Sequence, residues 1–458
     1  MIDINAISSV HFIGIGGVSN SAIAEILKHK GYEVSGSDIN MTPLTQRLSD
    51  KGIQIYKGHS AENIKDVDLV VYTAAVGDDN PELAYALKKG IPCLSRAEML
   101  GQLMIGYPHT IAISGTHGKT TTTSMLTRIF NDNQFDPTAL IGGDFIDIGS
   151  NVRIGSGDIF ITEACEYKES FLSFYPTIGI ILNVDEDHLD FYKDLDHITS
   201  AFLKFSNNIH EDGILVINGD DFNARKVSNA YKGRFITYGI TMDCHFTARN
   251  IVYNNLGCPT FDIFKEEVKL GTVDLSIPGQ HNIYNALAAF IAAYQITNDS
   301  AHIIERLSTF RNADRRFEKI GELKEIMLVD DYAHHPIEIK ATLEAASRIE
   351  KIKRIRCVFQ PHTYSRTKEL LHAFPSSFTA ADEVIITDIY AAREKDPGDI
   401  HAKDLYSALQ AEGINTKYIS DFNEIEAYFL ESAEAGDLII SIGAGDVFKI
   451  THSLISKL

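Results

Sequence analysis

The sequence has no CxxC pair, no apolar run long enough to cross a membrane, and few basic residues. Lys plus Arg number 42 against 62 Asp plus Glu, so the formal net charge is −20. Such a surface repels nucleic acid and anionic lipid. The five scattered cysteines are typical of reduced cytosolic thiols rather than of a disulfide framework or zinc site. No basic leader precedes an apolar stretch. We therefore expect a cytoplasmic protein without a nucleic-acid or membrane partner.

Short β-branched segments alternate with helical patterns along most of the 458 residues. This alternation predicts an α/β fold built on parallel sheets with right-handed crossovers. A linker-like stretch at residues 106–109 and a boundary near 308–313 divide the chain. The three domains that we predict are residues 1–105, 106–310 and 311–458. Between 235 and 275, short alternating segments separated by turn residues predict a small antiparallel insert.

A phosphate-binding loop is expected where the second domain begins. An apolar strand at 111–114 precedes it and a helical pattern follows it, which is the context that such a loop requires. Lys119 would bridge the terminal phosphates, and the Thr120 hydroxyl would bind Mg²⁺. Ile113 stands where the common ATPase pattern has its first glycine, so the loop is shortened, and a structural turn is the alternative. The residues that we expect around the phosphates are Gly115, Thr116, His117, Gly118, Lys119, Thr120 and Thr121.

A second glycine-rich loop, residues 14–19, follows the first strand and opens the first helix. Asp38 closes the next strand about 20 residues further on, as in a dinucleotide fingerprint. Ser19, however, occupies the position of the third glycine. The pattern therefore favours a diphosphate ligand without nicotinamide, with NAD and a purely structural turn as alternatives.

Ten segments taken together resemble the Mur ligase family. They begin with HFIGIGGVSNSAIAEIL at residue 11, end with IGAGDV at residue 447, and include SGTHGKTTTT, TEACEYKESF, NVDEDHLDFY and VDDYAHHPIEI. Each is weak alone, but their joint order over nearly the whole chain is specific. The resemblance implies a Rossmann-like UDP-sugar domain, a central ATPase domain, and a Rossmann-like domain that binds the amino acid and closes. It also implies ATP-dependent ligation of L-alanine to the carboxylate of UDP-N-acetylmuramate through an acyl phosphate, in peptidoglycan synthesis.

This chemistry brings anions together, so cations must stabilise it, and two Mg²⁺ ions are the expected solution. The resemblance implies that Glu163 binds metal together with Thr120, and that His188 binds the second ion. From the residues alone, Asp187 with a structural His188 is the alternative, because Mg²⁺ prefers oxygen ligands. Glu166 is expected only beside these ligands. The residues expected to be catalytic are Lys119, Glu163, His188, Arg316 and His334.

The resemblance also places the remaining ligand contacts. His281 and Asn282 are expected at the adenine, with a helix cap as the alternative for Asn282. Of the two adjacent arginines, Arg316 is expected over the γ-phosphate, and Asp331 at the ribose. Gly16, Gly17 and Val18 are expected to meet the diphosphate of the UDP-sugar, and Asp38 its uridine side.

The amino-acid pocket is expected around HTYSR, where Arg366 would hold the alanine carboxylate in a fork. Thr363 stands where many relatives carry a second arginine, and His335 is expected to be structural. The amino-acid-binding residues that we expect are Tyr332, His334, His362 and Arg366.

Three other functions share part of this pattern. A ligase that recycles a preformed tripeptide has the same N-terminal loop and is the closest rival. A non-enzymatic NAD-binding regulator would leave Lys119, Glu163 and Arg316 unexplained, and a folate–glutamate ligase would lack residues 1–105. We expect a monomer or a homodimer.

Overall fold

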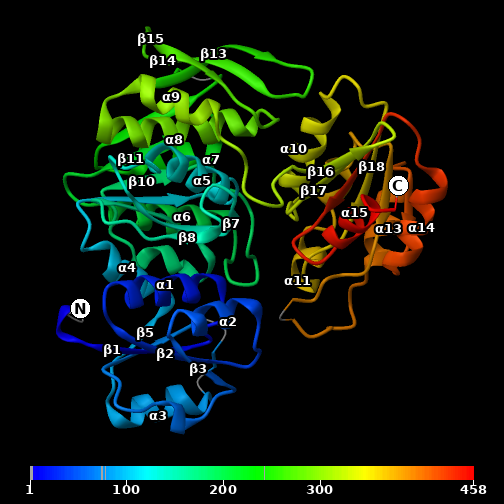
Figure 1. The fold of residues 1–458 in the computed structure, drawn as a ribbon. Helices are drawn as coiled ribbons and strands as arrows, with labels where there is room; N and C mark the ends of the chain where they lie inside the picture. The colour runs from blue at the N-terminus through cyan, green and yellow to red at the C-terminus, as the bar shows by residue number, and fades with distance from the viewer. Residues whose placement is uncertain (1–3, 74–75, 78, 242, 393, 458) are drawn as a thin grey trace.

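The computed structural model describes residues 4–73, 76–77, 79–241, 243–392 and 394–457, whose strands form three sheets (Figure 1). The predicted α/β fold is therefore confirmed. In the first sheet all strands are parallel and follow the order β3-β2-β1-β4-β5, which is Rossmann-like. Its strands are β1 (Ser9–Ile13), β2 (Glu33–Asp38), β3 (Gln54–Lys57), β4 (Leu69–Tyr72) and β5 (Cys93–Ser95). Its helices are η1 (Ile4–Ala6), α1 (Val18–His29), α2 (Pro43–Asp50), η2 (Ala61–Asn63), α3 (Pro81–Lys89) and α4 (Arg96–Met104).

The central sheet follows the order β15-β14-β13-β12-β11-β10-β6-β9-β7-β8. Its strands are β6 (His109–Ser114), β7 (Thr138–Phe145), β8 (Ser150–Arg153), β9 (Ile159–Glu163), β10 (Ile178–Ile181), β11 (Ile214–Asn218), β12 (Phe235–Gly239), β13 (Phe246–Tyr253), β14 (Pro259–Lys265) and β15 (Val268–Asp274). Strands β13–β15 are antiparallel to one another, as predicted. They are not a separate insert, however, because β13 pairs with β12 and extends the main sheet. The antiparallel pair β7–β8 at the other edge was not predicted.

The helices around the central sheet are α5 (Lys119–Phe130), η3 (Tyr167–Ser173), α6 (Leu195–Asn207), α7 (Phe222–Ala230), α8 (His281–Thr297) and α9 (Ser300–Ser308). Helix α8 is apolar on nearly every face, which is typical of a helix inside a core. It packs against α5, whose own apolar residues are buried in the same cluster. This packing fixes the start of α5, and with it the phosphate loop.

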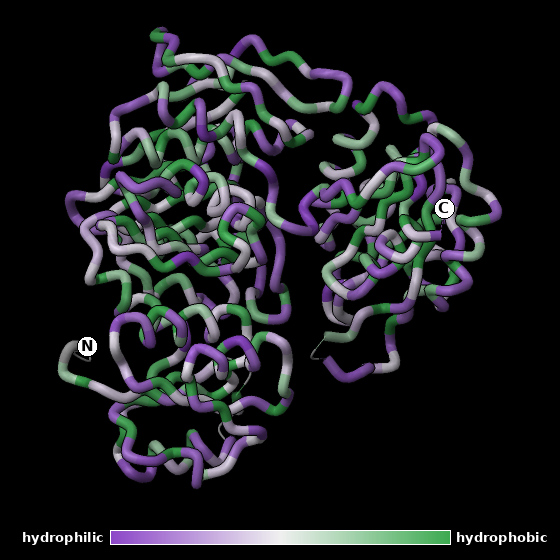
Figure 2. Tube along the Cα trace, in the orientation of Figure 1, coloured by the Kyte–Doolittle hydropathy of each residue, from purple (hydrophilic) through white to green (hydrophobic). Residues whose placement is uncertain are grey.

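The third sheet follows the order β16-β17-β21-β18-β19-β20, and only β16 is antiparallel to its neighbour among the described strands. Its strands are β16 (Glu318–Leu323), β17 (Ile326–Asp331), β18 (Arg354–Phe359), β19 (Glu383–Ile386), β20 (Thr416–Tyr418) and β21 (Asp437–Ile442). Its helices are α10 (Pro336–Ser347), α11 (Tyr364–Glu369), α12 (Phe374–Ser377), α13 (Ala402–Ala411), α14 (Phe422–Ser432) and α15 (Phe448–Leu454). Hydrophobic segments lie inside each domain and hydrophilic ones along the outer loops (Figure 2). Among the described residues, no helix combines the length and apolar character that crossing a membrane requires.

Different strands of the central sheet contact different domains. At the β8 edge, the Asn151 amide donates to the carbonyl of Val18 at 3.1 Å and accepts from Arg47 at 3.4 Å. At the end of β13, the third strand from the other edge, the Arg348 guanidinium lies 4.3 Å from the ring centre of Tyr253. Near it, the backbone N–H of Glu350 donates to Asn255. The central sheet therefore lies between the first and third domains and touches both.

Gly101 closes a tight contact between α4 and η3. A Cβ atom there would lie 2.1 Å from the carbonyl oxygen of Ser173. We predict that Gly101→Ala destabilises the protein by about 1–3 kcal/mol, the usual effect of overpacking. Urea unfolding measures the change. Gly143→Ala is the matched control, because nothing lies within 4 Å of its Cβ. Equal unfolding midpoints for the two variants would contradict the prediction.

Candidate active site

The phosphate loop connects the end of β6 to the first turn of α5. Gly118, directly before α5, has a φ of 86°, and a Cβ there would lie 2.5 Å from Asn285 Oδ1. Asn183, two residues after β10, holds the loop from the side. Its amide accepts from the backbone N–H of His117 at 2.8 Å and donates to the carbonyl of the same residue at 3.1 Å. The neighbouring parallel strands β6 and β10 thus hold the loop in place. The loop leads directly into the N-terminus of α5, where the helix dipole is positive and suits an anion.

Lys119 is the first residue of α5 and forms a buried ion pair with Glu166. Its Nζ lies 2.9 Å from Glu166 Oε2 and also donates to the carbonyl oxygens of Gly115 and Thr116. Burial opposes the charge on Lys119, but Glu166 outweighs it and raises the pKa. Lys119 is therefore a cation at neutral pH. Glu166, which we expected only beside the metal ligands, is its partner.

Arg315 and Arg316 have different environments. Arg315 points into its own domain, where it pairs with Asp330 at 2.8 Å and donates to the carbonyls of Gly443 and Gly445. Arg316 faces the central domain, and its Nη2 donates to Thr120 Oγ1 at 3.4 Å. The structure therefore places Arg316 at the phosphate loop, and gives Arg315 a role within the third domain.

His117 joins the phosphate loop to the third domain. Its Nδ1 lies 3.0 Å from Glu338 Oε1 of α10, and its Nε2 lies 3.8 Å from Asp185 Oδ2. Burial opposes the charge on the imidazole, but the two carboxylates outweigh it and raise its pKa to about 9. His335, next to His117, bonds the carbonyl of Glu186 through Nε2 and caps α10 through Nδ1. The charged imidazole of His117 therefore links the phosphate loop to the third domain.

A cavity of about 240 Å³ lies between α8, the phosphate loop and α10. Its lining includes the expected nucleotide contacts His117, Gly118, Thr121, His281, Asn282, Arg316 and Asp331. Asp331 accepts from the backbone N–H groups of Phe317 and Ala333, and burial raises its pKa to about 6. Asn282 is buried, and its amide bonds Pro278 and Asn285. It is not the N-cap of α8, which is Gln280, so the alternative that we allowed for Asn282 is wrong.

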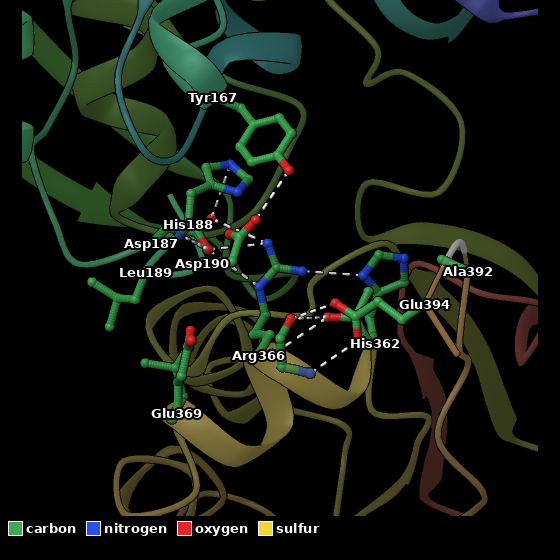
Figure 3. Close-up of a pocket in the computed structure, with 13 residues that line it drawn as sticks. Tyr167, Asp187, His188, Leu189, Asp190, His362, Arg366, Glu369, Ala392 and Glu394 are labelled. Atoms are coloured by element: carbon green, nitrogen blue, oxygen red, sulfur yellow. Dashed lines mark hydrogen bonds and ion pairs between the residues drawn. The ribbon is translucent and has the colours of Figure 1, made fainter. Parts of the chain in front are cut away.

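A second cavity, of about 360 Å³, lies between the loop after β10 and helix α11 (Figure 3). Arg366 points across it from α11 and pairs with Asp187 of the central domain at 3.0 Å. On its other side, Arg366 Nη1 donates to His362 Nδ1 at 3.1 Å. Burial lowers the pKa of His362 to about 3, so this imidazole is neutral and accepts.

His334 lies close to this cavity, with its ring centre 5.5 Å from that of His362. Burial lowers its pKa to about 4. Its Nδ1 lies 3.0 Å from the carbonyl oxygen of Tyr332, which only accepts, so Nδ1 carries the proton and Nε2 keeps a lone pair. Tyr332 itself lies under the guanidinium groups of Arg315 and Arg316, each 5.1 Å from the ring centre.

His188, which we expect to bind the second metal ion, lies beside two carboxylates. Ligand atoms of Glu166, Asp187 and His188 all lie within 4.8 Å of one another and fit a divalent cation. Glu163 is not part of this group. Glu163 instead accepts from the backbone N–H of Gly142 at 2.5 Å, at the end of β9. His188 is therefore placed with two carboxylates, one of which was only our alternative ligand.

The N-terminal glycine loop lies at the point where the strand order of the first sheet reverses, between β1 and β4. The backbone N–H of Gly16 donates to Asp38 Oδ2 at 2.9 Å, and Gly17 precedes the first residue of α1, Val18. Val18 is 48% exposed, so this loop is open to a ligand. Asp38 holds the loop, in addition to any contact with uridine.

Comparison with known proteins follows the same three-part division. Models of the Mur ligase family match residues 9–108 (catalytic domain), 113–293 (middle domain) and 315–445 (glutamate ligase domain). A UDP-N-acetylmuramate–L-alanine ligase from Alkaliphilus metalliredigens is 50% identical over 456 residues, covering 100% of this chain and 99% of that protein. The chain belongs to the Mur ligase family.

Two solved structures extend the comparison to the arrangement of the domains. The UDP-N-acetylmuramate–alanine ligase of Thermotoga maritima has a TM-score of 0.81 at 30% identity and covers 98% of both chains. A murein peptide ligase from Psychrobacter arcticus has a TM-score of 0.71 at 25% identity, also over 98% of both chains. The expected Mur ligase fold is therefore confirmed along the whole chain.

Sequence reasoning missed several residues of this Mur ligase site. Glu166 pairs with Lys119, Glu338 pairs with His117, Asn183 bonds the backbone of His117, and Asn285 lies next to Gly118. Asn183 and Glu338 carried a signal, because Asn183 follows a strand and Glu338 stands three residues after a His-Pro helix start. Nothing local indicated which of Glu163 and Glu166 pairs with Lys119.

The His117–Glu338 pair makes the stability of this Mur ligase depend on pH. The pKa of His117 is about 9 in the folded protein and 6.5 as its ordinary value. Its stabilising effect is therefore complete below about pH 6.5 and is lost as the pH rises through 9. We predict that wild type loses about 1–3 kcal/mol more stability than Glu338→Gln between pH 6.5 and 9.5. Urea unfolding at a series of pH values measures this, and parallel curves for the two proteins would contradict it.

Proposed function

We propose that this Mur ligase joins L-alanine to the carboxylate of UDP-N-acetylmuramate with consumption of ATP. The observation that carries the proposal is the 50% identity, over the full chain, with an enzyme of that name. The buried cations Lys119, Arg316 and Arg366 supply the positive charge that such anionic substrates need, although the protein carries a net charge of −20. Cytoplasmic location and a monomeric or homodimeric state stay predictions.

In the first step, a carboxylate oxygen of UDP-N-acetylmuramate attacks the γ-phosphorus of ATP. A C–O–P linkage forms, and ADP leaves with the electron pair of the broken P–O bond. Lys119 would be drawn from Glu166 to the terminal phosphates, and Arg316 would neutralise charge on the transferred group. Backbone N–H groups at the start of α5 would bind the remaining phosphate oxygens.

Magnesium fits this site through its donor set. Glu166, Asp187 and His188 lie together, and Thr120 and Glu163 are the ligands that family resemblance adds. The ion would neutralise charge on the phosphates when bound. The number of ions, two by our expectation, stays part of the proposal.

In the second step, the alanine nitrogen attacks the acyl carbon of the acyl phosphate. The C–N bond forms, the C–O bond to phosphate breaks, and inorganic phosphate leaves with that electron pair. Nε2 of His334 is the group that would take the proton from nitrogen, since its lone pair is free and its pKa is low. Arg366 would hold the alanine carboxylate, beside His362.

The remaining proposed contacts lie at the N-terminal glycine loop for the UDP-sugar and near the phosphate loop for ATP. The backbone of Gly16, Gly17 and Val18 would bind the diphosphate of the UDP-sugar, with Asp38 on the uridine side. Adenine would lie by His281 and Asn282, with its ribose at Asp331.

Recycling of a preformed tripeptide is less well supported, because the murein peptide ligase structure has the lower identity and TM-score of the two compared. An NAD-binding regulator is not favoured, because family models also match the central and C-terminal parts of the chain.

We predict that the purified protein releases phosphate only when ATP, Mg²⁺, UDP-N-acetylmuramate and L-alanine are all present. A colorimetric phosphate assay with single omissions tests this, and an amino-acid panel measures selectivity. Glycine and serine should react more slowly than alanine but still measurably, because a methylene-sized difference is worth only about 1–3 kcal/mol of discrimination. Equal activity with a preformed tripeptide would favour the recycling reaction instead.

Lys119→Ala removes the cation expected at the terminal phosphates. We predict that kcat falls at least about 10²-fold, because charge on the transferred phosphoryl group loses a preorganised partner. Circular dichroism checks that the fold is kept, and Lys232→Ala, an exposed lysine, is the matched control. Near-normal turnover of Lys119→Ala would remove Lys119 from the mechanism.

A further inference from the structure

The fork of the Arg366 guanidinium is already filled in the structure. Nε and Nη2 donate to Asp187 Oδ1 at 3.2 and 3.0 Å, and Nη2 also reaches Oδ2 at 3.4 Å. Nη1 is bonded to His362. Both charged side chains are nearly buried, Arg366 being 12% and Asp187 10% exposed. A carboxylate therefore already occupies the edge of the guanidinium that suits bidentate binding.

The two partners come from different domains. Asp187 lies on the loop after β10, and Arg366 on α11, so the pair crosses the cavity between the second and third domains (Figure 3). A second carboxylate cannot add to the same edge, because two like charges would then share one set of N–H donors in a partly buried site. A carboxylate that binds in a fork at the Nε–Nη2 edge must therefore take the place of Asp187.

We propose that Asp187 is a built-in competitor for the amino-acid carboxylate. In the unliganded enzyme it keeps Arg366 paired, and alanine binds only after Asp187 has left the guanidinium. This inference rests on the proposed function, in which Arg366 holds the alanine carboxylate. It adds a residue that sets the affinity for the amino acid without contacting it.

Asp187 has another partner within reach once it leaves Arg366. Nε2 of His188 lies 3.7 Å from Asp187 Oδ2 and 3.7 Å from Glu166 Oε1. The displaced carboxylate can therefore turn toward His188, whose backbone N–H already donates to Asp187 Oδ1 at 2.8 Å. Asp187 thus keeps a hydrogen-bond donor when its place at Arg366 is taken.

The test is L-alanine binding to the full-length protein, followed by ligand-observed NMR without nucleotide and with excess chelator. We expect Asp187→Asn to lower the Kd of L-alanine at least about tenfold, because apparent affinity scales with the fraction of protein whose site is free. Asp190→Asn is the matched control. It removes one charge from the same cavity, but its carboxylate accepts from the Tyr167 hydroxyl instead. L-alaninamide, which has no carboxylate, should not gain affinity from Asp187→Asn.

An unchanged or higher Kd in Asp187→Asn would overturn the proposal, as would equal tightening by Asp190→Asn. Absence of measurable binding in both wild type and Asp187→Asn also counts against it. Asp187→Ser replaces Asp187→Asn if that variant does not fold. Arg366→Ala in the same titration separates the two proposals. If Arg366→Ala binds L-alanine with wild-type affinity, Arg366 is not the anchor of the carboxylate. If Arg366→Ala loses binding while Asp187→Asn leaves the Kd of L-alanine unchanged, only the role of Asp187 as a competitor is excluded.

Discussion

Pairing of buried cations with the protein's own carboxylates is the constraint on which this structure depends. Lys119, His117 and Arg366 are needed as positive charges, yet each lies where an unpaired charge would be costly. Glu166, Glu338 and Asp187 supply the missing negative charges. An acidic protein can therefore keep a group of cations charged without substrate, and on our proposal a substrate carboxylate replaces Asp187 at Arg366.

Two of these pairs, His117–Glu338 and Asp187–Arg366, also link the central and C-terminal domains. His117 and Asp187 belong to the central domain, whereas Glu338 and Arg366 belong to the C-terminal domain. On our proposal, exchange of an internal carboxylate for a substrate anion would change the contacts between the two domains as well as the local charge. Small rearrangements at such an interface can become domain movements, because packed interfaces switch between discrete arrangements. Substrate binding would then be coupled to the arrangement of the domains through these charged groups.

Much of the fold could be predicted from local pattern. The strand–loop–helix around Lys119 and the apolar helix α8 are encoded in contiguous residues, and the structure has both. The pairs β7–β8 and β12–β13 were missed or misjudged, because strand pairing depends on residues far apart in sequence. The choice of Glu166 over Glu163 as the partner of Lys119 was missed for the same reason. It depends on how η3 turns away from β9, and Gly142 of another strand holds Glu163.

The central sheet runs without a break from β8, whose Asn151 touches the N-terminal glycine loop, to β13, whose Tyr253 touches the third domain. Hydrogen-bonded strands lie at a fixed spacing of about 4.8 Å, so the sheet has a defined width. The distance between the first-domain contact at β8 and the third-domain contact at β13 is therefore fixed by the strands that lie between them. The third domain also contacts the loops after β6 and β10, so the same sheet positions it at a second place.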